Sequence, residues 1–315
     1  MTDHAPQTLA AIDIGSNSIK LTVARRRRDG IEEFYWDSET VRLGEGIEAT
    51  GRLGDARMDA ARETLGRFAA TARELGAERT LAVATEALRV AANGRAFLER
   101  VARETGIDAA VIDGDREAAL TFAGLATTLD LAGAMVVADI GGASTEVIVA
   151  GDGRVEAVRS LPIGSGRLTD RFVREDPPHP DELARCRAAA RAMVGGEPSV
   201  ALLPAGPDVR LTLVGGTGEY LGKLVDAERG VTAAEVDRVL DRLSRVPAAD
   251  LANELSVAEA RARVLPAGVA IAAAVADLLR PGAIGVARSG IRAGLLLEAF
   301  GFAAAAGQED DDGVR

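Results

Sequence analysis

A short phrase that occurs twice in this 315-residue chain limits its fold more than any other feature. The two copies are Asp13–Ser18 and Asp139–Ser144, and both begin with Asp-Ile-Gly. Each copy lies between two apolar segments, which is the pattern of two strands joined by a tight turn of small residues. The repetition therefore predicts two β-hairpins, each with a carboxylate at the end of its first strand.

Segments of strand and helix type alternate along the rest of the chain. In the first half we expect strands at 9–13, 19–25, 31–37, 80–84 and 109–112, and helices at 55–75, 94–106 and 115–129. The second half repeats this plan, with a hairpin at 134–150, strands at 155–162, 209–214 and 283–287, and helices at 181–194, 217–224, 232–244, 256–279 and before 300. Such alternation is typical of a layered α/β fold.

The composition disfavours several classes of protein. With 37 basic and 48 acidic side chains the net charge is −11, which argues against general binding to nucleic acid or to an anionic membrane. The single cysteine excludes an internal disulfide and suits a reducing cytoplasm. The N-terminus has no signal-peptide core, and no apolar run approaches the roughly 20 residues of a membrane span. The two histidines lack catalytic neighbours, which disfavours a Ser–His–Asp hydrolase or a histidine-bound zinc enzyme.

The two turns contain residue types that suit a phosphate group. Glycines allow backbone amides to approach an anion, and neighbouring hydroxyl and amide side chains are further donors. We expect the turns to face each other and to bind phosphate through Gly15, Ser16, Asn17, Ser18, Gly141, Gly142, Ser144 and Thr145. Asp13, Asp139 and Glu146 can only accept, so beside a phosphate they would hold Mg²⁺ or position a water. The alternative is a pair of ordinary hairpins.

Three strand-to-helix junctions add candidates. Glu117 lies in the first turn of a helix, where the helix dipole favours a carboxylate, and simple capping is the alternative. Arg89 can present its guanidinium to phosphate, unless it is an ordinary exposed arginine. Gly215, Gly216 and Thr217 suit an anion or nucleotide at a helix N-terminus, or else close packing of strand and helix. The basic run Arg25–Arg28 is expected to be a solvated strand edge, with a docking patch for a polyanion as the alternative.

Taken together, these segments resemble the exopolyphosphatase / guanosine pentaphosphate phosphatase (Ppx/GppA) family of the actin-like ATPase superfamily. The resemblance covers roughly Leu9 to Phe300, and no single piece of it is decisive. The order and spacing of the pieces are specific, and the matching pieces are Ala11–Ser18, Arg42–Gly46, Ala84–Arg89, Ile112–Ala118, Asp139–Glu146, Leu161–Gly164, Gly215–Thr217 and Ser289–Gly294.

The resemblance implies two ribonuclease-H-like lobes, each with a mixed sheet flanked by helices, and an active site in the cleft between them. Residues 1–122 would form lobe I and residues 123–300 lobe II, with a helix at about 293–306 that packs back onto lobe I and a disordered acidic tail at 307–315. The resemblance further implies metal-dependent hydrolysis of a terminal phosphoryl group, with Mg²⁺ or alternatively Mn²⁺, by a cytoplasmic homodimer.

Roles for single residues also follow from the resemblance. By position, Glu117 resembles the carboxylate that activates the attacking water, and its place in the first helical turn is expected to keep it ionised. Asp139 and Glu146 resemble partners that hold metal and orient water, and phosphate donors are implied at Gly141, Ser144 and Ser16–Ser18. The first copy has Lys20 where the second has Glu146. We therefore expect the first turn to hold the anion and the second to hold the metal.

Departures from the family pattern bear on activity and substrate. Ala143 stands where the family has a third Gly, and Ala119 stands where it has an Arg. If position 143 requires a positive φ, alanine costs about 1 kcal/mol there. Longer members have further C-terminal domains, so short chains of inorganic polyphosphate are the expected substrate. The alternatives are hydrolysis of guanosine pentaphosphate (pppGpp), a catalytically weak polyphosphate- or nucleotide-binding regulator, and a sugar-kinase-like phosphotransferase.

Overall fold

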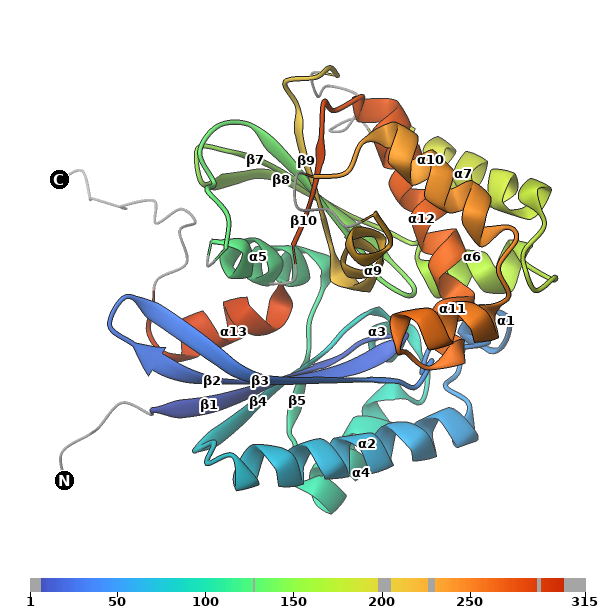
Figure 1. The fold of residues 1–315 in the computed structure, drawn as a ribbon. Coiled ribbons are helices and arrows are strands. Elements are labelled where there is room, and N and C mark those ends of the chain that lie inside the picture. Colours follow the sequence, from blue (N-terminus) through green and yellow to red (C-terminus); the bar gives the residue numbers. More distant parts are fainter. Residues whose placement is uncertain (1–6, 127, 198–204, 226–229, 288–289, 303–315) are drawn as a thin grey trace, which may run out of the picture.

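The computed structural model describes residues 7–126, 128–197, 205–225, 230–287 and 290–302, and these contain two five-stranded sheets (Figure 1). The first sheet consists of β1 (Thr8–Ile14), β2 (Ser18–Arg27), β3 (Gly30–Thr40), β4 (Arg79–Ala84) and β5 (Ala109–Val111). The second consists of β6 (Met135–Ile140), β7 (Thr145–Gly151), β8 (Arg154–Leu161), β9 (Arg210–Val214) and β10 (Ile284–Val286).

The two sheets have the same topology. Their strand orders are β3-β2-β1-β4-β5 and β8-β7-β6-β9-β10, so in both the third, second, first, fourth and fifth strands lie in that order. The first three strands of each sheet pair antiparallel, and the other two join in parallel. This repetition confirms the expected α/β fold with two ribonuclease-H-like lobes.

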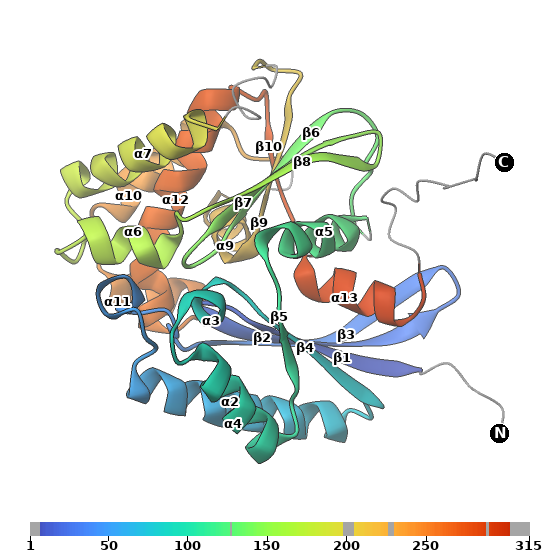
Figure 2. The ribbon, with the colours of Figure 1, turned by 180° about the vertical axis from the view of Figure 1, so that it is seen from behind.

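Helices cover both sheets and also lie between them. Figures 1 and 2 show α5 (Gly114–Leu125) and α13 (Ile291–Ala299) between the sheets, and α2 (Asp55–Glu74) and α4 (Gly94–Thr105) on the far side of the first sheet. The far side of the second sheet is covered by α7 (Pro180–Gly195), α10 (Ala233–Leu243) and α12 (Glu259–Leu279). The remaining helices are α1 (Ile47–Thr50), α3 (Glu86–Val90), α6 (Ser165–Phe172), α9 (Gly215–Val225) and α11 (Ala248–Leu255).

Close helix packing joins the two halves near the middle of the molecule. A Cβ on Gly294 of α13 would lie 2.0 Å from the carbonyl oxygen of Leu120 in α5, so only glycine fits there. On its other side α13 buries Leu296 and Phe300 against Leu9 of β1. The proposed division between residues 122 and 123 falls within α5, and the division stays a prediction.

The structure corrects some local expectations. The short helices α1, α6 and α11 were not expected, because none is long enough to show a helical period, whereas α3 lies at the strand-to-helix junction that was expected around Arg89. Helix α5 ends at Leu125 rather than near 129, and β3 extends to Thr40. The acidic tail at 307–315 and the end of the expected helix at 293–306 lie outside the described residues.

Helix α12 matches the helix expected at 256–279, except that it begins at Glu259. Its 21 residues are enough, by length and composition alone, to cross a membrane. However, 83% of its apolar window is buried inside the protein, where it packs against α7, α6 and α10. It is therefore a central core helix of the second lobe.

Candidate active site

The two copies of the repeated phrase form equivalent hairpin tips. In the first, the amide of Gly15 donates to the carbonyl of Ser18 at 3.1 Å, and in the second the amide of Gly141 donates to the carbonyl of Ser144 at 3.0 Å. The ladders match as well: Asp13 lies opposite Lys20, and Asp139 lies opposite Glu146. The sequence-based prediction of two hairpins is confirmed.

The tips meet in the space between the two sheets. A Cβ on Gly142 would lie 2.6 Å from the Cβ of Asn17 and 3.0 Å from its backbone nitrogen. A Cβ on Gly164, at the start of α6, would lie 2.4 Å from the carbonyl carbon of Gly142. Glycine at both positions is thus what allows the second tip to fit between the first tip and α6.

A small cavity of about 60 Å³ lies beside this contact. Tip residues and a glycine junction form most of its wall, namely Gly15, Ser16, Asn17, Ser18, Gly141, Gly142, Ser144, Gly215 and Gly216. The carboxylates of Asp13, Glu117 and Asp139 line it too. The structure therefore brings together residues that are separated by about two hundred positions in the sequence, and most of the predicted site residues are among them.

Four predicted site residues do not line this cavity. The hydroxyl of Thr145 donates to the carbonyl of Ile163 at 2.6 Å, and Thr217 is buried against α12. Arg89 donates to the carbonyl of Ile112 at 2.7 Å and forms an ion pair with Glu86. The fourth residue, Glu146, lies just behind the cavity. The roles of these residues as phosphate or metal ligands stay predictions.

Glu146 is held by hydroxyl groups. Ser160 Oγ donates to its Oε1 at 2.7 Å, and Ser144 is a second hydrogen-bond partner. Burial raises the pKa of Glu146 to about 7, with a further contribution from Asp139. A Cβ on Gly114 would lie 2.4 Å from Ser160 Cβ. The start of α5 therefore packs directly on β8, the strand whose Ser160 donates to Glu146.

The helix dipole does not keep Glu117 ionised, contrary to the expectation from sequence. Burial raises the pKa of its carboxyl to about 10, and the negative charges of Glu146, Asp13 and Asp139 add to this effect. Asp113 caps α5 by accepting from the amide of Arg116 at 2.8 Å, which is the arrangement of an ordinary N-cap. Desolvation and like charge outweigh a dipole effect, which is typically 0.3–1 kcal/mol at a helix end.

Two buried cations beside the cavity were missed by the sequence analysis. Arg261 of α12 lies over Gly216, where an added Cβ would be 1.5 Å from its guanidinium nitrogen. Arg292 of α13 interacts with Asp13. Burial lowers the pKa of both arginines and of Lys20, while Asp13 partly restores that of Lys20. Arg292 lies in a segment that matched the family, but nothing in the pattern around Arg261 indicated it.

Three buried polar atoms at this site have no hydrogen-bond partner. They are Asp13 Oδ1, Asn17 Nδ2 and Glu117 Oε2. Buried polar atoms are nearly always paired, so two free acceptors and one free donor that line one cavity indicate a ligand with both positive and acceptor groups. Mutually repelling carboxylates indicate a cation in the same way.

The donor set fits one kind of metal site. Among the described residues, no three His, Cys, Asp or Glu side chains are arranged to hold a metal ion by themselves. Mg²⁺ is usually bound through one or two carboxylates together with waters and substrate phosphates, so it does not require such a cage. Asp13 and Asp139, which lie at equivalent places on the two tips, are the carboxylates that fit this mode.

Ala143 is not strained. The non-glycine residues with positive φ among the described residues are Arg42, Asp152, Ser256 and Arg280, and Ala143 is not one of them. The strain energy that an alanine with positive φ would have does not arise at this position. The substitution by itself does not indicate a weakened site.

The cavity between the matching tips of two lobes with one topology is where the sequence placed the site, and the relatives of the chain identify it as a phosphoric anhydride hydrolase. The chain belongs to the Ppx/GppA phosphatase family, whose family model matches residues 22–301. Exopolyphosphatase 1 of Mycobacterium tuberculosis is 32% identical over 300 residues, which cover 92% of this chain and 87% of that protein.

Two further proteins resemble the chain. The guanosine-5'-triphosphate,3'-diphosphate pyrophosphatase of Vibrio atlanticus is 28% identical over 306 residues, covering 93% of this chain and 59% of that protein. The crystal structure of the Aquifex aeolicus Ppx/GppA family member has a TM-score of 0.73 at 29% identity and covers 93% of this chain and 97% of that one.

Proposed function

We propose that this protein is an exopolyphosphatase that hydrolyses the terminal phosphate of inorganic polyphosphate, preferably of short chains. The observation that carries the proposal is the group of free acceptors and buried cations around the cavity between the tips. The similarity to exopolyphosphatase 1 supports the substrate class. The tip amides and the hydroxyls of Ser18 and Ser144 would hold the terminal phosphoryl group.

Glu117 is the proposed general base. Its Oε2 lines the cavity and is free to accept a proton from a water that attacks the terminal phosphorus. The leaving chain departs with the bridging oxygen, and Lys20 and Arg261 lie where they can offset its negative charge. Asp13 and Asp139 would hold Mg²⁺ or Mn²⁺, which when bound neutralises phosphate charge and lowers the barrier to attack. Glu146 stays a predicted partner of that ion.

The raised pKa of Glu117 is consistent with this role only when positive charge is present. A general base must be ionised at the working pH, and a pKa of about 10 would leave it protonated near neutrality. A cation bound by Asp13 and Asp139 would offset the repulsion that raises this pKa. We therefore expect hydrolysis to require a divalent metal, which assays with and without a chelator would test.

Replacement of Glu117 tests the base directly. Glu117→Gln should lower the rate of phosphate release from polyphosphate by about 10²- to 10⁴-fold, which is the usual contribution of a general base. Phosphate release at the wild-type rate from the variant would contradict the assignment. A variant that binds polyphosphate normally but does not hydrolyse it would support it.

The same variant has a second, independent readout in its stability. The unfolded chain has an ordinary Glu pKa of 4.5 and the folded protein one of about 10, so without metal the folded state binds the proton more tightly. Its stability advantage is thus present below pH 4.5 and is lost as the pH rises toward 10. Glu117→Gln should raise the melting temperature by about a few degrees at pH 8 and leave it unchanged at pH 4.

Hydrolysis of pppGpp is the second candidate. The Vibrio relative has that activity in its name, and a groove that adjoins the cavity contains Trp36 and Tyr220, whose rings could stack on a base. Side-by-side turnover of polyphosphate and pppGpp separates the two candidates. Tight binding of either without phosphate release would instead indicate a regulator. A homodimer in the cytoplasm stays an expectation, which light scattering and fractionation would test.

A further inference from the structure

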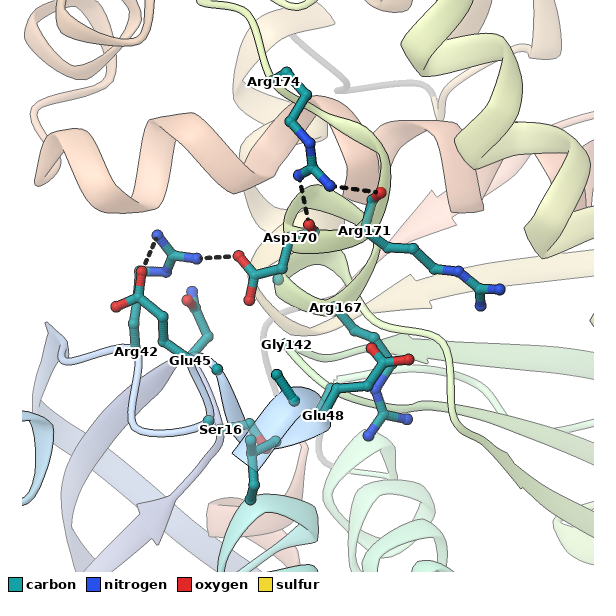
Figure 3. Close-up of a pocket in the computed structure, with 16 residues that line it drawn as sticks. Ser16, Arg42, Glu45, Glu48, Gly142, Arg167, Asp170, Arg171 and Arg174 are labelled. Carbon is teal, nitrogen blue, oxygen red and sulfur yellow. Dashed lines mark hydrogen bonds and ion pairs between the residues drawn. The ribbon is translucent and has the colours of Figure 1, made fainter. Parts of the chain in front are cut away.

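Two larger pockets adjoin the cavity between the tips. The first, of about 700 Å³, shares with the cavity Ser18, Lys20, Gly215, Gly216 and Arg261, and we call it the lysine groove. The second, of about 320 Å³, shares with it Ser16, Asn17, Gly142 and Ala143, and we call it the arginine pocket (Figure 3). The lysine groove and the arginine pocket have no lining residue in common, so the cavity connects two separate openings.

The lysine groove suits the body of a polyphosphate chain. It contains both lysines of the sequence, Lys20 and Lys223, together with Arg261 and Arg292, against three carboxylates, Asp37, Glu39 and Glu219, of which Glu219 pairs with Lys223 at 3.0 Å. Lys20 and Arg261 line the cavity as well, so positive charge continues from the groove to the tips. The groove is also the larger of the two pockets, at about 700 Å³ against about 320 Å³, which leaves more room for several linked phosphates.

The arginine pocket is built on the tip contact itself. The amide of Arg42 donates to the carbonyl of Asn17 at 2.8 Å, and the amide of Arg167 donates to the carbonyl of Gly142 at 3.0 Å. Asn17 and Gly142 are the two residues that touch where the tips meet. Each tip therefore has one arginine attached to it, and both side chains line the same pocket.

The two arginines form reciprocal ion pairs across the lobes. Arg42, which follows β3 of the first lobe, pairs with Asp170 of α6 in the second at 2.6 Å. Arg167 of α6 pairs with Glu86 of α3 in the first lobe, at a longer 3.7 Å. Figure 3 shows Arg42 between Asp170 and Glu45. Guanidinium groups bind phosphate in the same bidentate way as carboxylate, so a phosphate can replace either partner.

We propose that the arginine pocket is the exit site for orthophosphate, while the shortened chain stays in the lysine groove. This inference rests on the proposed function. Attack of water forms a new P–O bond and breaks the terminal P–O–P bond, Glu117 takes the proton, and the bridging oxygen leaves with the chain. Orthophosphate then leaves past Ser16 and Ala143, which line both the cavity and the arginine pocket, and Arg42 and Arg167 exchange their carboxylate partners for it. The chain can advance by one phosphate without dissociating.

Product inhibition tests the exit site. Arg167→Gln should raise the inhibition constant of inorganic phosphate about tenfold and change the KM for polyphosphate less than about twofold. Arg95→Gln is the matched control, because Arg95 has a 93% exposed side chain on α4. A KM that rises with chain length in Arg167→Gln would show that the substrate enters on this side and would overturn the proposal. An unchanged inhibition constant would also overturn it.

A variant that is expected to bind phosphate more tightly separates phosphate binding from a purely structural ion pair. Asp170→Asn removes the negative charge of one of the two carboxylates that pair with Arg42, so it should lower the inhibition constant of inorganic phosphate by about threefold or more. If the pair only holds the lobes together, Asp170→Asn would lower the melting temperature without tightening phosphate binding, and the proposal would fail.

The lysine groove predicts the complementary result. Lys223→Ala should raise the KM for polyphosphate and leave the inhibition constant of phosphate unchanged, and a larger effect on the inhibition constant would contradict the assignment of the two openings. If the protein releases no phosphate from any substrate, the proposed function fails. Calorimetric titration of inorganic phosphate into the wild type, Arg167→Gln and Asp170→Asn then still tests the arginine pocket by itself.

Discussion

The two hairpin tips have one backbone but opposite electrostatics. Both turns close with the same hydrogen bond, at 3.1 Å in the first and 3.0 Å in the second. Both tips have an aspartate at the same position of the strand pair. The residue across from it is Lys20 in the first tip and Glu146 in the second. Burial raises the pKa of both Asp13 and Glu117, but Lys20 partly offsets the rise at Asp13, whereas Glu146 adds to the rise at Glu117. The repeated phrase thus specifies a shape, and the residue opposite the aspartate makes the charge of the two tips different.

Removing the aspartate of either tip should have the largest effect on activity. If Asp13 and Asp139 jointly hold the metal, Asp13→Asn and Asp139→Asn should each lower activity by about 10²- to 10³-fold. Activity should recover partly at high Mg²⁺ concentration, because weaker binding is offset by mass action. Metal titration of both variants is the measurement. A large loss in one variant only would show that a single tip holds the ion.

The contact between the tips can be disrupted without altering any charge. Gly142→Ala places a Cβ 2.6 Å from Asn17, so the tips must separate, at a cost of about 1–3 kcal/mol in the free energy of unfolding. Activity should fall as well, because the donors of the two tips no longer face one phosphate. Gly54→Ala is the matched control, since its added Cβ has nothing within 4 Å and its φ is negative. Urea unfolding that showed equal stability for both variants would contradict this account.

The opposite charges of the tips predict opposite shifts in the pH profile. Glu146→Gln removes a negative charge that raises the pKa of Glu117, so the acid limb of the activity profile should move to lower pH. Lys20→Gln removes a positive charge that lowers the pKa of Asp13 and Asp139, so the limb should move to higher pH. Each shift should be about one pH unit. Shifts in the same direction would show that the two tips do not differ electrostatically as inferred.

The smallest effect on activity is expected at Ala143, which stands in the second tip where the family has a glycine. Ala143→Gly should change kcat/KM less than about twofold, because the alanine is not in the left-handed region and has no strain to release. Steady-state kinetics on polyphosphate would check this. A marked gain in activity would show that the methyl group hinders the substrate directly.

Much of the fold could be predicted because its signals are local. Asp-Ile-Gly between apolar segments determines a hairpin within about a dozen residues, and the repeat of that phrase indicated two lobes of one topology. The extents of short helices such as α3 and α6 could not be predicted, because their ends are determined by contacts with the tips rather than by a helical period. Ser16 Oγ, for example, accepts from the amide of Ala87 at 3.1 Å.

The basic run at Arg25–Arg28 likewise combines a feature that the sequence predicts with contacts that only the structure shows. Its place on a strand end was predicted, but the partners of its members come from elsewhere in the chain. Arg25 lies over the ring of Phe34 at 4.3 Å, Arg26 lies over Phe302, and Arg27 pairs with Glu32. These contacts match the solvated strand edge better than a docking patch for a polyanion.

By itself, the sequence determined the two tips, the family and the identity of the acidic residues at the site, because each of these depends on neighbours in the chain. Only the tertiary structure decided the raised pKa of Glu117 and the presence of Arg261 and Arg292 beside the cavity. A pKa depends on burial and on charges brought close in space, and four carboxylates from both lobes meet here. The arginine pocket likewise exists only because Asn17 and Gly142 touch across the lobes.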